Sequence, residues 1–519
     1  MPELPPFVKA LFKPDAYPEP VKDIALKQTQ MSFVFLAGDY VYKVKKPVNL
    51  GYLDYSTIEK RHHFCQRELE LNRRLCPDVY LGVVTITEDS GGIAINGSGS
   101  VIEYAVRMRR LPQARMMDAL LAGDKVTPEM LEKLAKRLAK FHQEAETNGQ
   151  ISSFGKLETI RHNNDENFSQ TEKYIGKAIP QARYTRLEDF SKDFIERHHT
   201  LFEKRASDGR IRDLHGDLHA AHICFTDGIC IYDCIEFNDR FRYGDVASEV
   251  AFLAMDLDHY GRADLSRRFI NSYIAESGDK EIKELLKFYK SYRAYVRGKV
   301  ACFKLDDPYI SDEDKQASLT EASGYFQLSQ SYVKQKPTLL ITAGLVGCGK
   351  TSYSQFLASR LGMVVISSDV TRKRLAGIPP TEHRYESFEG GIYSPEFGLK
   401  TYDAMFKEAA GILAEGYSVI LDASFIKADM RQEAQKLAES AAADFVAVEC
   451  YLDESGVKER LEHRLKEASP SDGRWEIYPR QKKEFEPLVD IPPRNYVIID
   501  TSESVETNIE KVIDRIGQL

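Results

Sequence analysis

The second half of the chain alternates short apolar runs with longer amphipathic segments. The apolar runs are strand candidates, and they lie at 338–343, 363–367, 418–422, 445–451 and 496–500. The segments between them carry apolar residues at helical spacing. Alternation of this kind predicts a parallel sheet that is covered by helices on both faces. We therefore expect an α/β domain with a five-stranded parallel sheet.

The first 330 residues follow another pattern, with strands near the start and helices afterwards. Residues 32–45 predict a hairpin with its turn at Gly38–Asp39. Residues 57–75 predict a charged helix. Two further strands are predicted at 80–87 and 100–108. From about residue 127 helices dominate, and we find neither an internal repeat nor a low-complexity tract. This half is expected to be α+β.

The chain has 519 residues, which is too long for a single hydrophobic core. Residues 306–315 are polar and rich in turn formers, and Pro337 disfavours helix in the residue before it. We predict a first domain at 1–305, a linker with a helix at 306–336, and a second domain at 337–519.

The composition is that of an ordinary soluble globular protein, with 43% hydrophobic and 29% charged residues. A net charge of −8 provides no overall field that would attract nucleic acid or an anionic membrane. The start lacks the basic and apolar regions of a signal peptide, and there is no run of about eighteen apolar residues. We expect a cytoplasmic protein without a membrane partner, and nucleic acid is disfavoured as a ligand.

Eight cysteines are scattered along the chain without a Cys-x-x-Cys pair. In a long chain without a secretion signal, this pattern favours reduced, mostly buried thiols over a disulfide or zinc framework.

The segment from Gly344 to Thr351 reads Gly-Leu-Val-Gly-Cys-Gly-Lys-Thr, and it lies between a predicted strand and a predicted helix. Its glycines let the backbone fold round phosphates so that several N–H groups point at the anion. Lys350 can reach the β- and γ-phosphates, and the Thr351 hydroxyl can bind Mg²⁺. The segment predicts an ATP–Mg²⁺ site. Its expected cofactor-binding residues are Gly344, Gly347, Cys348, Gly349, Lys350, Thr351 and Ser352.

A second constellation suited to phosphoryl transfer lies in the helical region. Residues 214–225 read Leu-His-Gly-Asp-Leu-His-Ala-Ala-His-Ile-Cys-Phe, and a strand-like segment ending in Asp233 follows. Phosphoryl transfer needs a carboxylate that orients the attacking hydroxyl and accepts its proton, together with ligands for Mg²⁺. Asp217 fits the first role and Asp233 fits the second.

These segments resemble the aminoglycoside phosphotransferase family, which shares the protein-kinase-like fold. The resemblance implies a bilobal domain in which His-Gly-Asp is followed by an Asn and then by a metal-binding Asp. His222 stands where the family has Asn. A neutral imidazole can bind Mg²⁺, although it is a softer ligand than an oxygen donor. His222 is therefore a candidate metal ligand. The alternatives are a hydrogen bond to Asp217, contact with the substrate, or a degenerate site.

A kinase-like fold also implies a strand lysine that holds the α- and β-phosphates and pairs with a helix glutamate. Lys43 and Lys45 share one face of the predicted hairpin, because they are two residues apart. Glu68 is the best partner on the predicted helix, with Glu70 as the alternative. The other interpretation of these residues is a solvated charged strand beside a salt-bridged helix.

Three further features of the first half have a structural and a functional interpretation. His142 ends a helix that resembles the one before the catalytic segment of the family, and we expect it to be packed. Asp245 is expected to cap the helix that follows it. Arg293 and Arg297 share a helix face, which suits either an anionic substrate group or a solvated basic surface.

Beyond the phosphate loop, the chain resembles small P-loop kinases of the gluconate kinase, polynucleotide kinase and zeta-toxin type. Asp369 follows the second strand at the edge where ligands of open α/β sheets gather. The resemblance implies that Asp369 receives the substrate hydroxyl and that Arg372 steadies an anionic group. A helix cap is the alternative role for Asp369. Asp422 ends the third strand and is expected to support Mg²⁺.

Arg460 and Arg464 share one face of a helix that resembles the arginine-bearing lid of such kinases. A lid arginine neutralises charge on the transferring phosphoryl group and helps to exclude water. Arg474 is another candidate, and Trp475, the only tryptophan, falls in the same region. Basic residues that favour the helix dipole are the alternative interpretation.

Together these motifs predict a bifunctional ATP-dependent kinase that phosphorylates hydroxyls of small molecules at two separate sites. One alternative is a single active P-loop kinase that is regulated by a nucleotide-sensing first domain. Another is a kinase for nucleic-acid ends or nucleotide sugars. The motifs leave both acceptors and the oligomeric state open, because pockets vary while phosphate-binding groups do not.

Overall fold

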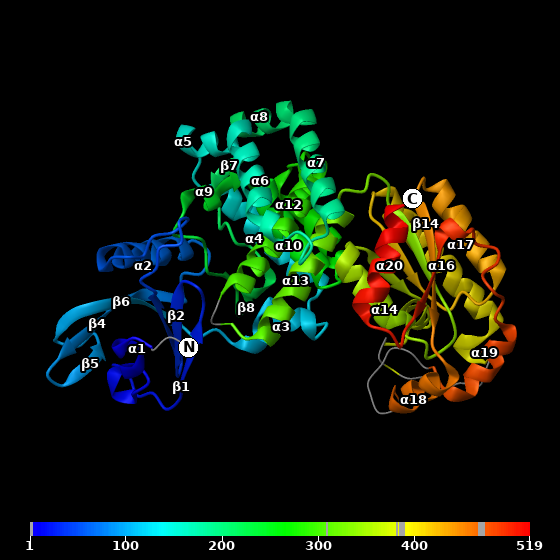
Figure 1. Ribbon diagram of the computed structural model, residues 1–519, viewed down its shortest axis with the longest axis horizontal. Helices are drawn as coiled ribbons and strands as arrows, with labels where there is room; N and C mark the ends of the chain where they lie inside the picture. The colour runs from blue at the N-terminus through cyan, green and yellow to red at the C-terminus, as the bar shows by residue number, and fades with distance from the viewer. Residues whose placement is uncertain (1–3, 308–309, 380–381, 383–389, 465–472, 519) are drawn as a thin grey trace. The chain divides into compact units, whose positions relative to one another are not determined.

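The computed structural model describes residues 4–307, 310–379, 382, 390–464 and 473–518. The chain divides into two compact units (Figure 1). The first contains Met1–Asp256 and Arg267–Ser329, and the second contains Leu257–Ser266 and Gln330–Leu519. The domain and linker limits given above stay a prediction.

The first unit begins with an antiparallel six-stranded sheet in the order β1-β2-β3-β6-β4-β5. The strands are β1 Ile24–Gln28, β2 Ser32–Ala37, β3 Tyr40–Lys45, β4 Tyr80–Asp89, β5 Gly92–Ile95 and β6 Ser100–Arg109. The predicted hairpin is the β2–β3 pair, and the predicted strands at 80–87 and 100–108 lie within β4 and β6. The sequence pattern did not indicate β1 and β5, which are short strands at the two edges of the sheet.

Helix α2, Ile58–Asn72, packs against β4 and β6 of this sheet (Figure 1). Its first turn is capped by Thr57, whose Oγ1 accepts a hydrogen bond from the Lys60 amide. The alternation of β3 buries Tyr42 and Val44 in the core on one face of the sheet. The side chains of Lys43 and Lys45 consequently lie on the other face.

The rest of the first unit is mostly helical. Its helices are α1 Pro6–Ala10, α3 Met117–Ala122, α4 Pro128–Glu144, α5 Gly149–Ser152, α6 Leu157–Thr171, α7 Gln181–Arg197, α8 His199–Ser207, α9 Asp239–Arg242, α10 Val246–His259, α11 Ala263–Ser277, α12 Ile282–Phe303 and α13 Asp312–Ser331, of which α10, α11 and α13 extend into the second unit. Two short antiparallel pairs complete it: β7 Ile211–Asp213 with β10 Tyr243–Asp245, and β8 Ile223–Phe225 with β9 Ile229–Ile231. This is the kinase-like arrangement that the sequence predicted.

Cys76 and Cys230 are joined by a disulfide, although they are 154 residues apart in the sequence. Their Cα atoms lie 4.7 Å apart, because the end of α2 comes next to β9. The expectation that all eight cysteines are reduced is therefore wrong for this pair. The other six are free and buried, as expected.

The second unit contains a five-stranded sheet, and every neighbouring pair in it is parallel. The strands are β11 Thr338–Ala343, β12 Val364–Ser367, β13 Val419–Asp422, β14 Asp444–Tyr451 and β15 Tyr496–Asp500, in the order β12-β13-β11-β14-β15. The helices are α14 Lys350–Leu361, α15 Ser368–Leu375, α16 Pro395–Ala414, α17 Ala428–Ser440, α18 Glu454–Arg464, α19 Tyr478–Glu484 and α20 Val505–Gly517. The predicted α/β domain is confirmed.

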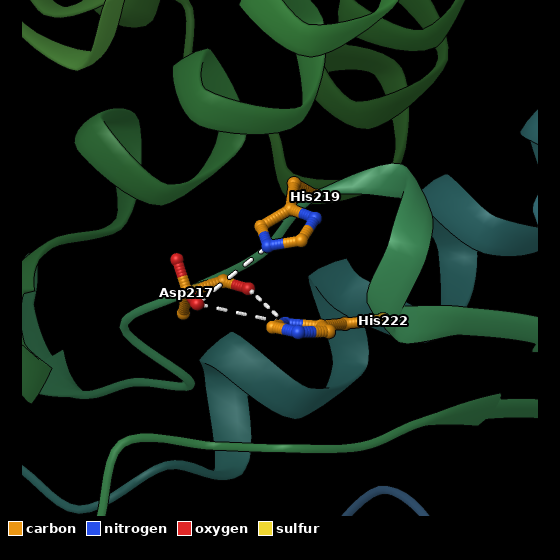
Figure 2. Close-up of side chains that lie close together, drawn as sticks. All are labelled: Asp217, His219 and His222. Carbon is orange, nitrogen blue, oxygen red and sulfur yellow. Dashed lines mark hydrogen bonds and ion pairs between the residues drawn. The ribbon is translucent and has the colours of Figure 1, made fainter. Parts of the chain in front are cut away.

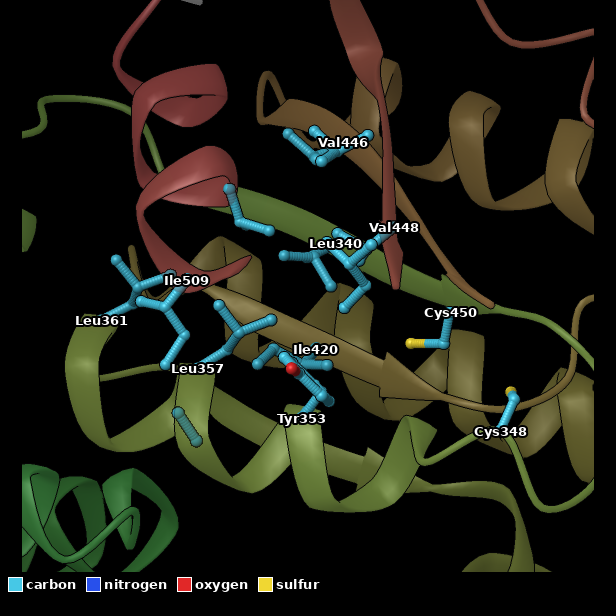
Figure 3. Close-up of a cluster of buried hydrophobic side chains, with 14 of the residues drawn as sticks. Leu340, Cys348, Tyr353, Leu357, Leu361, Ile420, Val446, Val448, Cys450 and Ile509 are labelled. Atoms are coloured by element: carbon cyan, nitrogen blue, oxygen red, sulfur yellow. The ribbon is translucent and has the colours of Figure 1, made fainter. Parts of the chain in front are cut away.

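Each face of the parallel sheet has its own hydrophobic core. Figure 3 shows Leu357 of α14 and Ile509 of α20 packed against Leu340 and Val448 of the central strands. The opposite face packs against α16 and α17. Burial of β11 on both faces explains why its sequence is almost continuously apolar.

A search of the described residues finds no helix that is both long and apolar enough to cross a membrane. The cytoplasmic location stays a prediction.

Candidate phosphoryl-transfer sites

Glu68 of α2 lies between the two lysines of β3. One carboxylate oxygen is 2.8 Å from Lys43 Nζ, and the other is 2.8 Å from Lys45 Nζ. Burial alone would lower the pKa of Lys43, but Asp233 and Glu68 outweigh it and raise the pKa. Both lysines therefore stay charged, and Glu68 is the carboxylate that the strand lysines contact.

The two lysines differ in what else they contact. Lys45 is fully buried, and its ammonium also donates to Glu236, which accepts a second hydrogen bond from Tyr55 Oη at 2.6 Å. Lys43 reaches Asp233 and lines a cavity of the first unit, whereas Lys45 does not line it. Of the two candidates, Lys43 is the one that a ligand in the cavity can contact.

Buried hydrogen bonds hold the backbone of the His-Gly-Asp segment. Glu249 Oε1 accepts from the amides of His215 and Gly216 at 2.9 and 2.7 Å. Glu249 Oε2 is 2.7 Å from His142 Nε2. Gly216 has a φ of 87°, and a Cβ there would come 2.9 Å from the carbonyl oxygen of Phe241. His142 is thus packed as expected, and it helps to position Glu249.

Asp217 faces two imidazole rings. Figure 2 shows the rings of His219 and His222 pointing towards it. Asp217 Oδ2 is 3.6 Å from His219 Nε2 and 3.6 Å from His222 Nδ1. Burial favours the neutral acid, but the positive charge of His219 outweighs it and lowers the pKa of Asp217. Asp217 is an anion at neutral pH, as a group that orients a hydroxyl must be.

His222 is placed between Asp217 and Asp233. Its Nδ1 is 3.0 Å from the carbonyl oxygen of Asp217, an acceptor, so the proton belongs on Nδ1. Nε2 then carries the lone pair and lies 3.5 Å from Asp233 Oδ2. Burial lowers the pKa of His222 to about 4, which keeps the ring neutral. A neutral nitrogen beside a carboxylate can bind a divalent cation.

Asp233 has a positive φ of 63°, which is uncommon outside glycine and clusters at functional sites. Its carboxylate contacts Lys43 from β3 and faces His222 from the short 3-10 helix Ala220–His222 before β8. Asp217, Lys43 and Asp233 line the same cavity of about 1690 Å³. The first unit therefore brings together its six predicted site residues, which are Lys43, Lys45, Glu68, Asp217, His222 and Asp233.

Asp245 caps α10 through the amide of Ala247 at 2.8 Å and accepts two hydrogen bonds from Arg205, at 2.7 and 2.8 Å. Its predicted structural role is confirmed.

In the second unit, residues 344–349 connect β11 to the N-terminus of α14. Gly347 has a φ of 82°, and a Cβ there would come 2.9 Å from Val457 and Leu461 of α18. Cys348 is buried in the hydrophobic core, and Lys350 Nζ donates to the carbonyl oxygen of Leu345 at 2.7 Å. Ser352 is exposed in the first turn of α14. The loop has the strand–loop–helix setting that the motif requires.

Thr351 and Asp422 meet at the end of the sheet, where Thr351 Oγ1 donates to Asp422 Oδ2 at 2.9 Å. Burial raises the pKa of Asp422, and the nearby negative charge of Asp369 raises it further. Arg372 Nη1 is 3.0 Å from Asp369 Oδ1, and its guanidinium lies over the ring of Tyr393. Asp422 ends β13 opposite Ser367 of β12, and Asp369 follows two residues later in α15, so both acids come from the ends of neighbouring strands. Their shared action on one ligand stays a prediction.

Arg460 of α18 lies against the phosphate loop. Its Nη1 and Nη2 donate to Thr501 Oγ1 at 2.9 Å and to the Thr501 carbonyl oxygen at 2.7 Å. A Cβ at Gly349 would come 2.9 Å from Arg460 Nη1. The side chain of Arg464 lies outside the described residues. Trp475 stacks on Tyr478, with 5.1 Å between ring centroids.

Several residues of both sites were not singled out in the sequence. Glu236 and Glu249 are buried acids, and His219 lies within the 214–225 segment. Gln481 of α19 accepts a hydrogen bond from the Val346 amide in the phosphate loop at 2.9 Å. An acidic residue in an apolar context was the available signal for the two glutamates. Gln481 carried no such signal, because its partner is 135 residues away in the sequence.

Two family models match the chain, one in each half. The model of the phosphotransferase enzyme family matches residues 60–285, and that of an AAA domain matches residues 339–488. The protein is a phosphotransferase that joins a kinase-like domain of the aminoglycoside phosphotransferase type to a P-loop kinase domain. Uncharacterized protein Rv2004c of Mycobacterium tuberculosis is 32% identical over 441 residues, covering 84% of this chain and 85% of the relative. Uncharacterized protein Mb2027c of Mycobacterium bovis matches to the same extent. The chain belongs to the family of these mycobacterial proteins.

Solved structures resemble single parts of the chain. An amicoumacin kinase, hAmiN, is 13% identical, with a TM-score of 0.40, covering 62% of this chain and 92% of its own. A gluconokinase from Sinorhizobium meliloti 1021 is 21% identical, with a TM-score of 0.26, covering 36% of this chain and 94% of its own. These partial likenesses do not indicate the acceptor of this chain.

Substitution of Lys45 is expected to reduce stability, whereas substitution of Lys43 is expected to reduce phosphoryl transfer. Lys45→Met leaves Glu236 without its cation in a buried site, so we expect the free energy of unfolding to fall by about 3–5 kcal/mol. Lys43→Met keeps Lys45 beside Glu68 and should retain near-normal stability, while phosphoryl transfer at this site falls by roughly 10²- to 10³-fold. Thermal unfolding and transfer assays of both variants measure this. The assignment of Lys43 is wrong if only Lys45→Met reduces transfer without unfolding.

The phosphate loop predicts a crowding effect that can be separated from backbone strain. Gly347→Ala would press on α18, whereas Gly416→Ala, with a φ of 85°, meets no atom within 4 Å. Both substitutions cost about 1–2 kcal/mol of strain. Only Gly347→Ala should also weaken nucleotide binding, by roughly tenfold or more, because overpacking costs about 1–3 kcal/mol. Titration of each variant with a fluorescent ATP analogue measures its affinity for nucleotide. Equal affinities of Gly347→Ala and Gly416→Ala would contradict the expectation.

His219 should report the charge of Asp217. Burial lowers the pKa of His219, but Asp217 outweighs burial and raises it. The ion pair therefore stabilises the fold fully below about pH 6.5, and this contribution is lost as the pH rises through the raised pKa. Asp217→Asn leaves burial unopposed, so His219 should then titrate below its ordinary value. NMR titration of the imidazole checks this, with the exposed Asp227→Asn as the control. An unchanged titration in Asp217→Asn would refute the coupling.

Proposed function

We propose that the protein is a bifunctional ATP-dependent kinase that phosphorylates hydroxyls of two small molecules at separate sites. One observation carries this proposal. Each unit contains its own candidate lysine for phosphate, its own candidate metal ligands and its own candidate carboxylate for an acceptor hydroxyl. The two sets share no residue. Two complete sets favour two catalytic sites over one.

In the first unit, Lys43 would hold the phosphates while Glu68 keeps its ammonium in place. His222 and Asp233 would hold Mg²⁺, because a neutral imidazole nitrogen and a carboxylate lie 3.5 Å apart there. When bound, Mg²⁺ neutralises charge on the phosphates. Asp217 would orient the acceptor hydroxyl and take its proton as the hydroxyl oxygen bonds to the γ-phosphorus, while the bond from that phosphorus to the β–γ bridging oxygen breaks and ADP leaves.

In the second unit, Lys350 and the loop amides would hold the triphosphate, and Thr351 with Asp422 would hold Mg²⁺. Asp369 would orient and deprotonate the acceptor hydroxyl, while Arg372 holds an anionic group of the acceptor. Arg460 would stabilise charge on the transferring phosphoryl group, since its guanidinium already lies beside the loop.

The alternative is a single active P-loop kinase whose first unit senses nucleotide without catalysis. It is favoured by His222, because imidazole is a softer ligand than an amide oxygen for Mg²⁺. A kinase for nucleic-acid ends or nucleotide sugars is a third possibility for the second unit, and phosphorylation of an oligonucleotide tests it directly.

The test is a screen of a metabolite pool with γ-labelled ATP on the full chain. Wild type, Asp217→Asn and Lys350→Ala are compared, with the exposed Asp208→Asn as a control. We expect one labelled product to be lost in Asp217→Asn and a different one in Lys350→Ala. Each loss should be about 10²- to 10⁴-fold, the size expected for a positioned proton acceptor or a transition-state contact.

Two outcomes would reject bifunctionality. If every product persists in Asp217→Asn and disappears in Lys350→Ala, the first unit is not catalytic. If every product depends on Asp217 alone, the second unit is not a kinase.

A further inference from the structure

The cavity of the first unit continues past Asp217 to a wall formed by α12. The cavity has a volume of about 1690 Å³. It is lined by Lys43, where we propose that the nucleotide binds, and by Arg293 and Arg297 of α12. Pockets for one small ligand usually hold about 300–1,000 Å³. The cavity therefore has room for a second molecule beside a nucleotide, and α12 is positioned to contact that molecule.

Arg293 is held from behind by neutral groups. Its Nε donates to Ser248 Oγ at 3.1 Å, and its Nη1 donates to the carbonyl oxygen of Gly216 at 3.4 Å. The guanidinium lies 4.8 Å from the centre of the Phe252 ring. Within the described part of the chain, Arg293 has no carboxylate at ion-pair distance. These contacts hold the half-buried guanidinium of Arg293 next to Gly216, the residue before Asp217. No carboxylate of the described residues neutralises this charge by an ion pair.

Arg297 lies one turn further along α12 on the same face. Its Nε donates to Tyr325 Oη at 3.4 Å, and Nη2 is 4.0 Å from Glu321, which is the limit of an ion pair. Burial lowers its pKa, but the negative charges of Asp256 and Asp217 are among those that raise it. Arg297 is thus a permanent cation within electrostatic reach of the carboxylate predicted to orient the acceptor.

Positive charge predominates on this side of the cavity. The lining residues of α6, α12 and the 214–217 segment include three cations, Arg293, Arg297 and Lys299, and two carboxylates, Glu166 and Asp217. Glu166 is already paired with Arg240 at 2.8 Å. Lys299 Nζ has amide oxygens as partners, Asn167 at 2.7 Å and Gln170 at 2.8 Å, and burial lowers its pKa to about 8. A buried cation without an anion is costly, and an anionic ligand would offset that cost.

We propose that the acceptor of the first unit is an alcohol that carries a carboxylate or phosphate group, and that Arg293 and Arg297 bind this anionic group. The proposal rests on the proposed function of this unit. Arginine binds both oxyanions through paired N–H donors, so the geometry suits either. An acceptor anchored on α12 would present its hydroxyl to Asp217, which lies on the same side of the cavity. Cationic amino sugars would be repelled by the same residues.

The experiment measures binding with four sugars that share one ring skeleton and differ in charge. Glucose is neutral, glucosamine is cationic, and glucuronate and glucose 6-phosphate are anionic. Inorganic phosphate serves as a minimal oxyanion, and because it has no carbon-bound proton its binding is measured by competition with the anionic sugars. Binding to full-length Lys350→Ala is followed by saturation-transfer NMR, with saturating AMP-PNP and Mg²⁺ to occupy nucleotide sites. The carboxylate and phosphate sugars separate the two possible anionic groups.

We expect at least one anionic sugar or phosphate to bind, and glucose and glucosamine to bind far more weakly. Arg297→Gln and Arg293→Gln should each weaken anion binding by about 10- to 100-fold, the loss of one charged hydrogen-bonding group. Arg293→Lys keeps the charge and should retain part of the affinity for anions. This variant still tests the proposal if Arg293→Gln does not fold. Arg161→Gln, at an exposed arginine of α6 paired with Glu196, is the matched control and should change nothing.

The proposal is overturned if glucosamine or glucose binds as well as the anions, if none of the anions binds, or if the arginine variants bind anions like the control. Transfer from γ-labelled ATP is assayed in parallel to separate the two proposals. Arginine-dependent anion binding without Asp217-dependent transfer to any acceptor would reject the proposed function and leave the anion site standing. If transfer to neutral acceptors depends on Asp217 and is unchanged in Arg293→Gln and Arg297→Gln, the anion site alone is rejected.

Discussion

The first unit depends on a carboxylate that is shared by two lysines. Glu68 has no exposed surface, and each of its oxygens contacts a different ammonium. A buried charge without a partner costs several kcal/mol, so Glu68 needs a lysine of β3 beside it for this region to fold. Lys45 extends the network to Glu236, and Lys43 extends it to Asp233. One electrostatic requirement therefore fixes the sheet, α2 and the segment that contains Asp233 and Glu236 relative to one another.

The different roles that we assign to Lys43 and Lys45 follow from their positions in this network. Lys45 is the inner member, enclosed by Glu68, Glu236 and Tyr55. Lys43 is the outer member and keeps one side towards the cavity. Two lysines with the same spacing and the same face are equivalent in the sequence. Only the depth of each in the fold separates a structural cation from one that can meet a phosphate.

The two proposed phosphate sites are built in different ways. The first uses side chains from separate elements, which are held by buried partners such as Glu68 and Glu249. The second is centred on the backbone amides and Lys350 of one short loop that leads into a helix. This difference explains how well each site could be predicted. The loop at 344–351 is complete within one segment, whereas the first site is assembled from segments 190 residues apart in the case of Lys43 and Asp233.

The sequence by itself determined whatever depends on neighbours along the chain. The five parallel strands, the β2–β3 hairpin and the phosphate loop were readable because burial and turn geometry leave a periodic or contiguous pattern. The partners Glu236, Glu249 and Gln481, the Cys76–Cys230 disulfide and the choice between Lys43 and Lys45 were decided only by the tertiary structure. So was the setting of Arg293 and Arg297, which the helix pattern left open between a solvated surface and a ligand site. In each of these cases the deciding quantity is burial or a contact across the fold, and neither is encoded in local spacing.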